Sequence, residues 1–100
     1  MGLAFKGNEF NFGAAAVTLT TALGLSTRID FSHVVIRAAS TNTGVINIGG
    51  STLTTTTNRW GYLAAEESLT IAVEHGFMHS DSVFLIATVS GDDAHIILVS

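Results

Sequence analysis

Apolar and polar residues alternate with a period of two along much of the chain, which is typical of half-buried β-strands. The clearest example is residues 68–74, where Leu69, Ile71 and Val73 alternate with serine, threonine, alanine and glutamate. Residues 17–23 follow a similar alternation, with Val17 and Leu19 on one face. Both segments predict strands that bury one face and expose the other to solvent.

Two later segments, residues 82–90 and 94–100, are apolar on both faces. This pattern favours strands at the centre of a sheet or strands covered on their second side. The sequence "GDD" at 91–93 separates them and predicts a hairpin turn. Gly49 and Gly50 end the segment "VINI" at 45–48 in the same way, and residues 54–62 predict a loop or an exposed edge.

The segment 28–40 is less regular, because its apolar residues fall on two competing faces. A β-bulge near Ser32 or His33 would reconcile the two faces, and burial of the strand on both sides is the alternative. Residues 61–69 contain good helix formers but span fewer than three turns, so they predict a loop that leads into the strand at Ser68.

Together these patterns predict six to eight short strands in an all-β, antiparallel β-sandwich of jelly-roll or Ig-like type. A chain of 100 residues is long enough for one such domain, over residues 17–100. Residues 1–16 differ, since they combine glycines with three aromatic residues: Phe5, Phe10 and Phe12. They predict either an extended arm that reaches a neighbouring subunit or a first strand of the same domain.

Composition points to association with other protein. Only 12% of the residues are charged, against about 25% in typical domains. Thirteen threonines and nine serines take their place. Few charges favour association over colloidal solubility, so we expect a homo-oligomer.

Several partner classes are disfavoured. The net charge is −4 and the four basic residues are dispersed, whereas nucleic-acid binding needs several cations on one face. The N-terminal residues lack the pattern of a secretory signal, and no run is as long as a membrane span. We therefore expect a protein made in the cytoplasm, with neither nucleic acid nor membrane as its partner.

Candidate metal sites are weak. His75 and His79 are four residues apart, but Gly76 lies between them and metal sites usually need a third ligand. Asp92 and Asp93 beside Gly91 are typical of a polar turn, whereas a calcium ion would need six or more oxygen ligands. We expect no bound metal and no cofactor.

Nucleophilic catalysis is also disfavoured. Asp30, Ser32 and His33 are close in sequence, but adjacent strand residues point to opposite faces, so Ser32 and His33 should diverge. The chain has no glycine-flanked nucleophile elbow. The sequence predicts that the protein is not an enzyme.

Large residues in a loop of small ones mark the best contact candidate: Arg59, Trp60 and Tyr62. Tryptophan, tyrosine and arginine dominate the energetics of protein interfaces. The alternative is that Trp60 caps the end of the sandwich core, with Tyr62 beside it.

The chain resembles small structural proteins of tailed bacteriophage virions. The resemblance lies in "VIRAASTNTGVINIGGSTLTTTTNRWGYLAAEESLTI" at 35–71 and in "DSVFLIATVSGDDAHIILV" at 81–99, which looks like the closing hairpin of those proteins. The loop in that group usually ends Asn-Gly-Tyr, whereas here Arg59 and Trp60 stand between Asn58 and Gly61. The phenylalanine-rich start is not part of the pattern.

The resemblance implies a β-sandwich subunit of the virion, such as a capsid decoration (cement) protein bound to the major capsid protein or another virion protein. Binding at symmetry axes of the shell would favour a trimer, although closed symmetry alone does not select one. Partner contacts are expected from Phe5, Phe10 and Phe12 in the arm and from Arg59, Trp60 and Tyr62 in the loop. The alternative is a receptor- or glycan-binding module of a head fibre or tail, with Trp60 stacked on a sugar ring.

Overall fold

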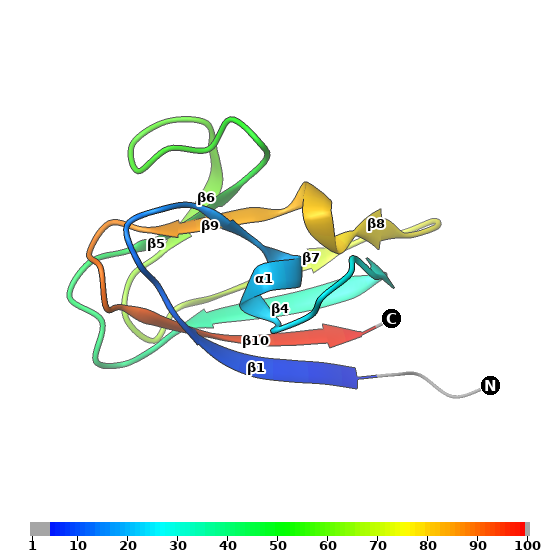
Figure 1. Cartoon of the computed structure of the whole chain (residues 1–100), viewed down its shortest axis with the longest axis horizontal. Coiled ribbons are helices and arrows are strands. Elements are labelled where there is room, and N and C mark those ends of the chain that lie inside the picture. Colours follow the sequence, from blue (N-terminus) through cyan, green and yellow to red (C-terminus); the bar gives the residue numbers. More distant parts are fainter. Residues whose placement is uncertain (1–4, 100) are drawn as a thin grey trace.

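Two four-stranded antiparallel sheets lie face to face in the computed structural model, which describes residues 5–99 and their side chains from residue 7 onward (Figure 1). The first sheet has the order β1 (Phe5–Asn11), β10 (Asp93–Val99), β4 (His33–Ala38), β7 (Ser68–Ala72). The second has the order β2 (Val17–Thr18), β9 (Phe84–Ala87), β5 (Ile46–Gly49), β6 (Arg59–Leu63). A small ribbon pairs β3 (Asp30–Phe31) with β8 (Met78–His79), and two short helices complete the described elements: α1 (Leu19–Ala22) and η1 (Ser80–Ser82).

The strand order is that of a jelly roll. With the eight sandwich strands counted along the chain, the first pairs with the eighth and the third with the sixth in one sheet. The second pairs with the seventh and the fourth with the fifth in the other sheet. This nested pairing defines the double-sheet jelly roll and differs from the order of an Ig domain. The predicted antiparallel β-sandwich is confirmed, in its jelly-roll form.

The two segments that are apolar on both faces, β9 and β10, are each central in their sheet, as their pattern predicts. The predicted hairpin between them is wrong. A turn does lie at 88–92, with Gly91 in the left-handed region at a φ of 98°. However, β9 pairs with β2 and β5, whereas β10 pairs with β1 and β4, so the turn crosses from one sheet to the other.

The predicted strand over 17–23 is also wrong after its first two residues. Leu19, Ala22 and Leu23 are all buried, and their spacing of three and four residues suits one face of a helix. The side chain of Thr18 accepts a hydrogen bond from the backbone N–H of Thr21 and caps helix α1. The threonine alternation that suggested a strand therefore gives way to a single helical turn packed on the core.

Strand 28–40 is interrupted at Ser32, where an irregularity was expected. Phe31 is buried before the break, and Val34 and Ile36 are buried after it, so the inward phase shifts by one residue. The backbone of Ser32 still forms hydrogen bonds to the segments on either side of it in the sheet. Its N–H donates to the carbonyl oxygen of Val99 in β10, and its carbonyl oxygen accepts from the N–H of Val73, just after β7. The break lets both apolar sets reach the same core.

A loop at 39–45 is fixed to the turn before β10 by the carboxylate of Asp92. The Asp92 oxygens accept from the backbone N–H groups of Thr43 and Gly44, at 3.1 and 2.9 Å. A Cβ on Gly44 would lie 2.3 Å from Thr88 Oγ1, so only glycine fits there. "NTG" and "GDD" are thus structural partners, which agrees with the polar-turn interpretation of Asp92.

The core between the sheets is a single cluster of side chains from both layers, and Phe12 belongs to it. Within the described residues, no helix is long and apolar enough to span a bilayer.

Candidate partner-binding surface

The loop candidates lie on β6, the edge strand of the second sheet, beside a projecting loop at 50–58 (Figure 1). Ile48 pairs with Gly61, but the next residue, Gly49, pairs with Arg59. Two residues of β6, Arg59 and Trp60, therefore oppose one residue of β5, which is the pattern of a β-bulge. Bulges re-aim side chains at sheet edges. Here the bulge turns Arg59 toward the side of the strand that carries Tyr62.

Arg59 and Tyr62 form a cation–π pair. The guanidinium carbon of Arg59 lies 4.6 Å from the centroid of the Tyr62 ring. Arg59 Nη1 also donates to Asn47 Oδ1 at 3.4 Å, from the neighbouring strand. Tyr62 remains 58% exposed. The arginine is thus positioned by two contacts, while one face of the pair stays open to a partner.

Trp60 is 53% exposed and does not belong to the core cluster. A Cβ built on Gly50 would lie 3.4 Å from Trp60 Cζ2, so the indole lies close to the backbone of Gly50. The alternative in which Trp60 caps the end of the core is not what the structure has. The Trp60 ring lies at the surface, close to the backbone of Gly50 on one side.

The loop at 50–58 is held by contacts within itself and with β5. Asn47 is fully buried on β5, and its Nδ2 donates to Thr55 O at 2.8 Å. Asn58 adopts a left-handed φ of 59°, and its Nδ2 donates to Thr52 O at 3.0 Å. Leu53 is buried against Gly49. These contacts fix the loop beside the exposed aromatic residues.

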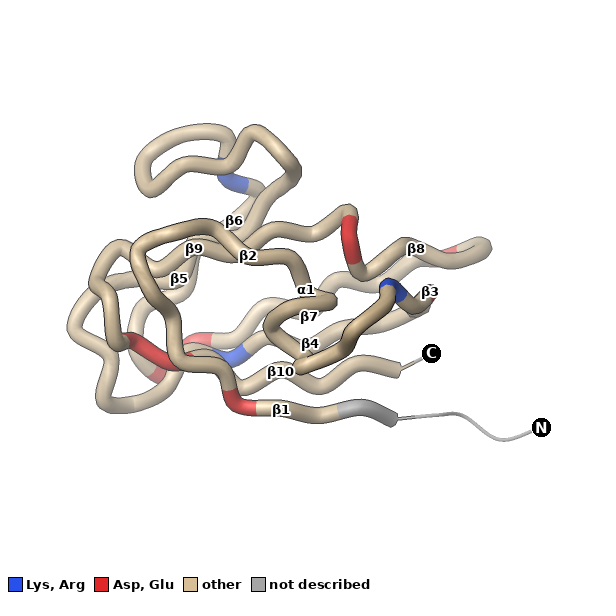
Figure 2. Tube along the Cα trace, viewed as in Figure 1, with Lys and Arg blue, Asp and Glu red and all other residues tan. Residues whose placement is uncertain are grey.

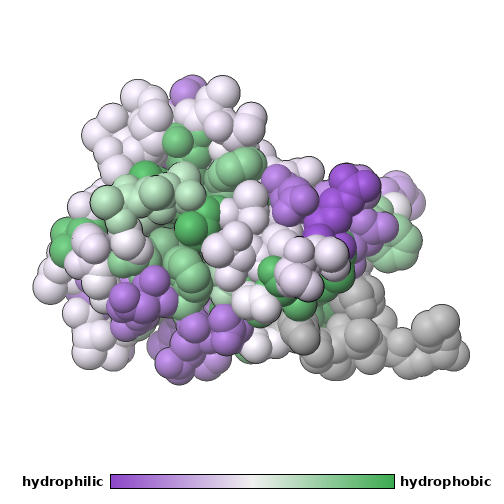
Figure 3. Space-filling model, viewed as in Figure 1, coloured by the Kyte–Doolittle hydropathy of each residue, from purple (hydrophilic) through white to green (hydrophobic). Residues whose placement is uncertain are grey.

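The surface around β6 is nearly free of charge. Between Arg37 and Glu66 the only charged residue is Arg59, and Figure 2 shows a single blue segment at the base of the projecting loop. In Figure 3 this loop is mostly pale, the colour of intermediate hydropathy. The loop and three residues of β6, Arg59, Trp60 and Tyr62, therefore form one surface that carries a single charge, that of Arg59. We call it the β6 surface.

The N-terminal candidates are placed differently. Residues 5–11 form β1, which pairs with β10 of the same chain, so this segment is a first strand rather than an arm. Phe12 is buried, and its ring meets that of Phe10 edge to face at 4.9 Å. Phe10 is partly buried against the same core. The expectation that Phe10 and Phe12 clamp a neighbour is not supported by these positions, and the side chain of Phe5 lies outside the described residues.

One histidine of the candidate pair, His79, is engaged by a carboxylate. Its Nδ1 lies 2.5 Å from Asp30 Oδ1 across the β3–β8 ribbon. Among the residues that the structure describes, no group of three or more histidines and carboxylates could hold a metal ion.

Ser32 and His33 do not diverge as predicted. His33 Nδ1 lies 3.1 Å from Ser32 Oγ, because Ser32 sits in the break between β3 and β4 rather than in a regular strand. Ser32 Oγ also donates to Val99 O at 3.3 Å. Because Ser32 Oγ donates its proton to Val99 O, that proton is not directed at His33, as a general-base role would require. Asp30 is engaged by His79, so the three residues form no triad.

Two exposed apolar features were not singled out from the sequence. Phe77 is 66% exposed, next to Gly76 in the turn between β7 and β8. Val35 and Ile97 are 37% and 46% exposed on the outer face of the first sheet. The signal for this second feature was present in the sequence, since 94–100 is apolar on both faces.

No known protein-family model matches this chain, and no curated protein matches its sequence.

Proposed function

We propose that this protein is a non-catalytic structural subunit of a bacteriophage virion, most simply a capsid decoration protein that binds the shell through its β6 surface. The observation that carries the proposal is the exposure of Trp60 and Tyr62, with Arg59 stacked on Tyr62, on a surface almost free of charge. These three residue types are enriched where protein interfaces concentrate their binding energy.

Two further observations support this function. Jelly rolls are a recurrent architecture of viral capsid domains, although a fold by itself does not fix a function. The shortage of charged residues suits a subunit that buries its surface against other proteins. Burial of apolar area contributes about 25 cal/mol per Å², so a modest contact repeated over a shell would stiffen it considerably.

The test is co-sedimentation of the purified protein with particles of its phage that lack it. Trp60→Ala and Tyr62→Ala should each weaken binding by about 30-fold, which corresponds to about 2 kcal/mol for a central interface residue. Phe77→Ala is the matched control, because it removes an aromatic residue that is at least as exposed, in the turn between β7 and β8. Equal binding by all variants would rule out the β6 surface, and no binding by the wild type would rule out the decoration role.

A second candidate is a glycan- or receptor-binding module of a head fibre or tail. The half-exposed ring of Trp60 beside a threonine-rich loop favours it, because sugars stack on aromatic rings and bond to hydroxyls and amides. Lectin domains also use the jelly roll. A glycan array with wild-type protein and Trp60→Ala tests it. Signals that disappear in the variant support this role, and a blank array excludes it for the glycans presented.

A further inference from the structure

Two neighbouring rows of residues cross the outer face of the first sheet, one with opposite charges at Glu9 and Arg37 and one that is apolar. Strand register places Glu9, His95 and Arg37 side by side on β1, β10 and β4, in one row across the sheet. The next outward row contains Gly7, Ile97 and Val35 in the same strand order. Both rows continue onto β7 at the opposite edge of the sheet, where Ser68 pairs with Arg37 and Thr70 with Val35.

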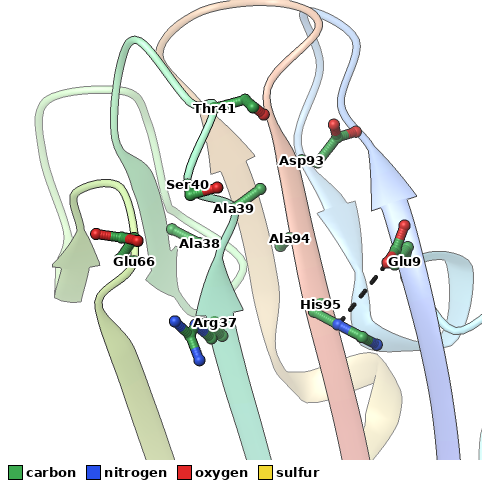
Figure 4. Close-up of a pocket in the computed structure, with 10 residues that line it drawn as sticks. All are labelled: Glu9, Arg37, Ala38, Ala39, Ser40, Thr41, Glu66, Asp93, Ala94 and His95. Carbon is green, nitrogen blue, oxygen red and sulfur yellow. Dashed lines mark ion pairs between the residues drawn. The ribbon is translucent and has the colours of Figure 1, made fainter.

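Two shallow hollows meet at this row. One, of about 320 Å³, is lined by Val35, Arg37, Ser68, His95 and Ile97. The other, of about 420 Å³, lies toward Asp93 and Glu66 and shares Arg37 and His95 with the first. Figure 4 shows the side chains of Glu9, His95 and Arg37 projecting from three adjacent strands, with Glu9 Oε1 3.9 Å from His95 Nδ1.

We infer that this face binds the same face of a second copy of the chain, through a two-fold contact centred on β10. Consider a face-to-face pair whose two-fold axis lies between the two sheets and is parallel to β10. Strand β1 of each copy then lies over β4 of the other. Glu9 then meets Arg37 of the second copy, and Arg37 meets Glu9. The dimer thus contains two Glu9–Arg37 pairs, in which every carboxylate and every guanidinium of the two rows has one partner.

The apolar row is complementary under the same operation. Val35 of one copy lies over Gly7 of the other, where the missing side chain leaves room for it. Ile97 lies on the axis and meets Ile97 of the second copy. Charge and shape therefore select the same two-fold arrangement independently.

The ends of the face do not oppose this contact. Asp93 lies beyond the charged row, and its carboxylate accepts from Asn11 Nδ2 at 2.7 Å. Twisted sheets pack at about −30° and separate away from the crossing point. The Asp93 side chains of the two copies consequently fall outside the closest contact.

This contact is small, because only three strands of each copy meet. Interfaces below about 1,200 Å² of total buried area are typical of weak, transient complexes. We expect a dissociation constant of about 0.1 mM in solution. Where copies are held close together on a particle, effective concentrations in the millimolar range would be enough to close the contact. The inference does not depend on the proposed virion role, and it replaces the expected three-fold contact by a two-fold one for this face.

The test uses the whole chain in sedimentation equilibrium between about 10 µM and 1 mM, a range that brackets the expected dissociation constant. The wild type should approach a dimer mass. Glu9→Arg and Arg37→Glu should each weaken association by at least tenfold, because like charges then face each other. An equimolar mixture of these two variants should dimerise again, since every facing pair in the mixed dimer is opposite in sign.

A cross-link tests the position of the axis. The chain has no cysteine, so Ile97→Cys should form a disulfide-linked dimer under mild oxidation, whereas Phe77→Cys should not. A wild type that stays monomeric at 1 mM, a trimer mass, a mixture of the charge variants that fails to associate, or equal cross-linking of both cysteine variants would each overturn the proposal. Because none of these measurements involves a virion, failure here is distinguishable from failure of the proposed function.

Discussion

The guanidinium of Arg59 stacks on the ring of Tyr62, three residues later in the chain, with its central carbon 4.6 Å from the ring centroid. In a regular strand, residues three apart point to opposite faces. The bulge at Trp60 removes that separation. The pair is therefore a product of strand irregularity, and it is accessible to a partner because β6 is an edge strand.

A double-mutant cycle over Arg59 and Tyr62 should show a coupling energy of about 0.5–1 kcal/mol, the size expected of an exposed cation–π pair. Urea unfolding of Arg59→Gln, Tyr62→Leu and the double variant measures it. Tyr62→Phe is the control, since it keeps the ring and should retain the coupling. A coupling near zero would mean that the two side chains do not interact in solution.

Phe12→Ala should lower the free energy of unfolding by about 3–5 kcal/mol, because it empties a fully buried aromatic site in the core. Phe77→Ala should change it by less than about 0.5 kcal/mol, since Phe77 is exposed. Thermal or urea unfolding compares the two. Equal, small effects would instead favour an N-terminal arm that is not part of the folded domain.

Asp92→Ala should destabilise the protein by about 1–3 kcal/mol, because the backbone N–H groups of Thr43 and Gly44 lose their acceptor. Hydrogen exchange should accelerate at those two amides and leave β1 protected. Asp81→Ala is a contrasting carboxylate variant, because Asp81 accepts from Thr20 at the opposite end of the sandwich and not from this loop. Unchanged exchange at Thr43 and Gly44 in Asp92→Ala would show that the Asp92 carboxylate does not hold the loop at 39–45.

Local patterns identified most strands, because a strand that packs on a core must alternate whatever its partners are. They failed at Leu19. The apolar residues there fit a single helical turn as well as a strand, and only the capping residue Thr18 distinguishes the two. They also failed at the turn before β10. A three-residue polar turn can join paired strands or strands in opposite sheets, and the long-range partners of β9 and β10 decide between them.

The sequence predicted which residues of the β6 surface stand out, but not that they face the same way. Arg59, Trp60 and Tyr62 stand out by size among threonines, but their common direction depends on the bulge, which requires knowledge of the register with β5. The outer face of the first sheet was hidden for a similar reason. The apolar face of β10 is visible in the sequence, whereas the alignment of Gly7 beside Ile97 comes from the pairing of residues 90 positions apart.

Gly7 provides a final test that separates stability of the subunit from self-association. A Cβ at this position would meet only Ile96 O, at 3.7 Å, and the backbone is not in the left-handed region, so a side chain fits without strain. Gly7→Val should raise the free energy of unfolding by about 0.5–1 kcal/mol, because glycine is unfavourable in a strand and β-branched residues are favoured there.

The same change should weaken the dimer by about tenfold or more, because the added side chain occupies the space for Val35 of the second copy. Gly13→Ala is the control, since it lies outside β1 with open space around it and should leave dimerisation unchanged. Urea unfolding at low concentration and sedimentation at high concentration report the two effects separately. A Gly7→Val protein that is more stable yet dimerises as tightly as the wild type would place the self-contact on another surface.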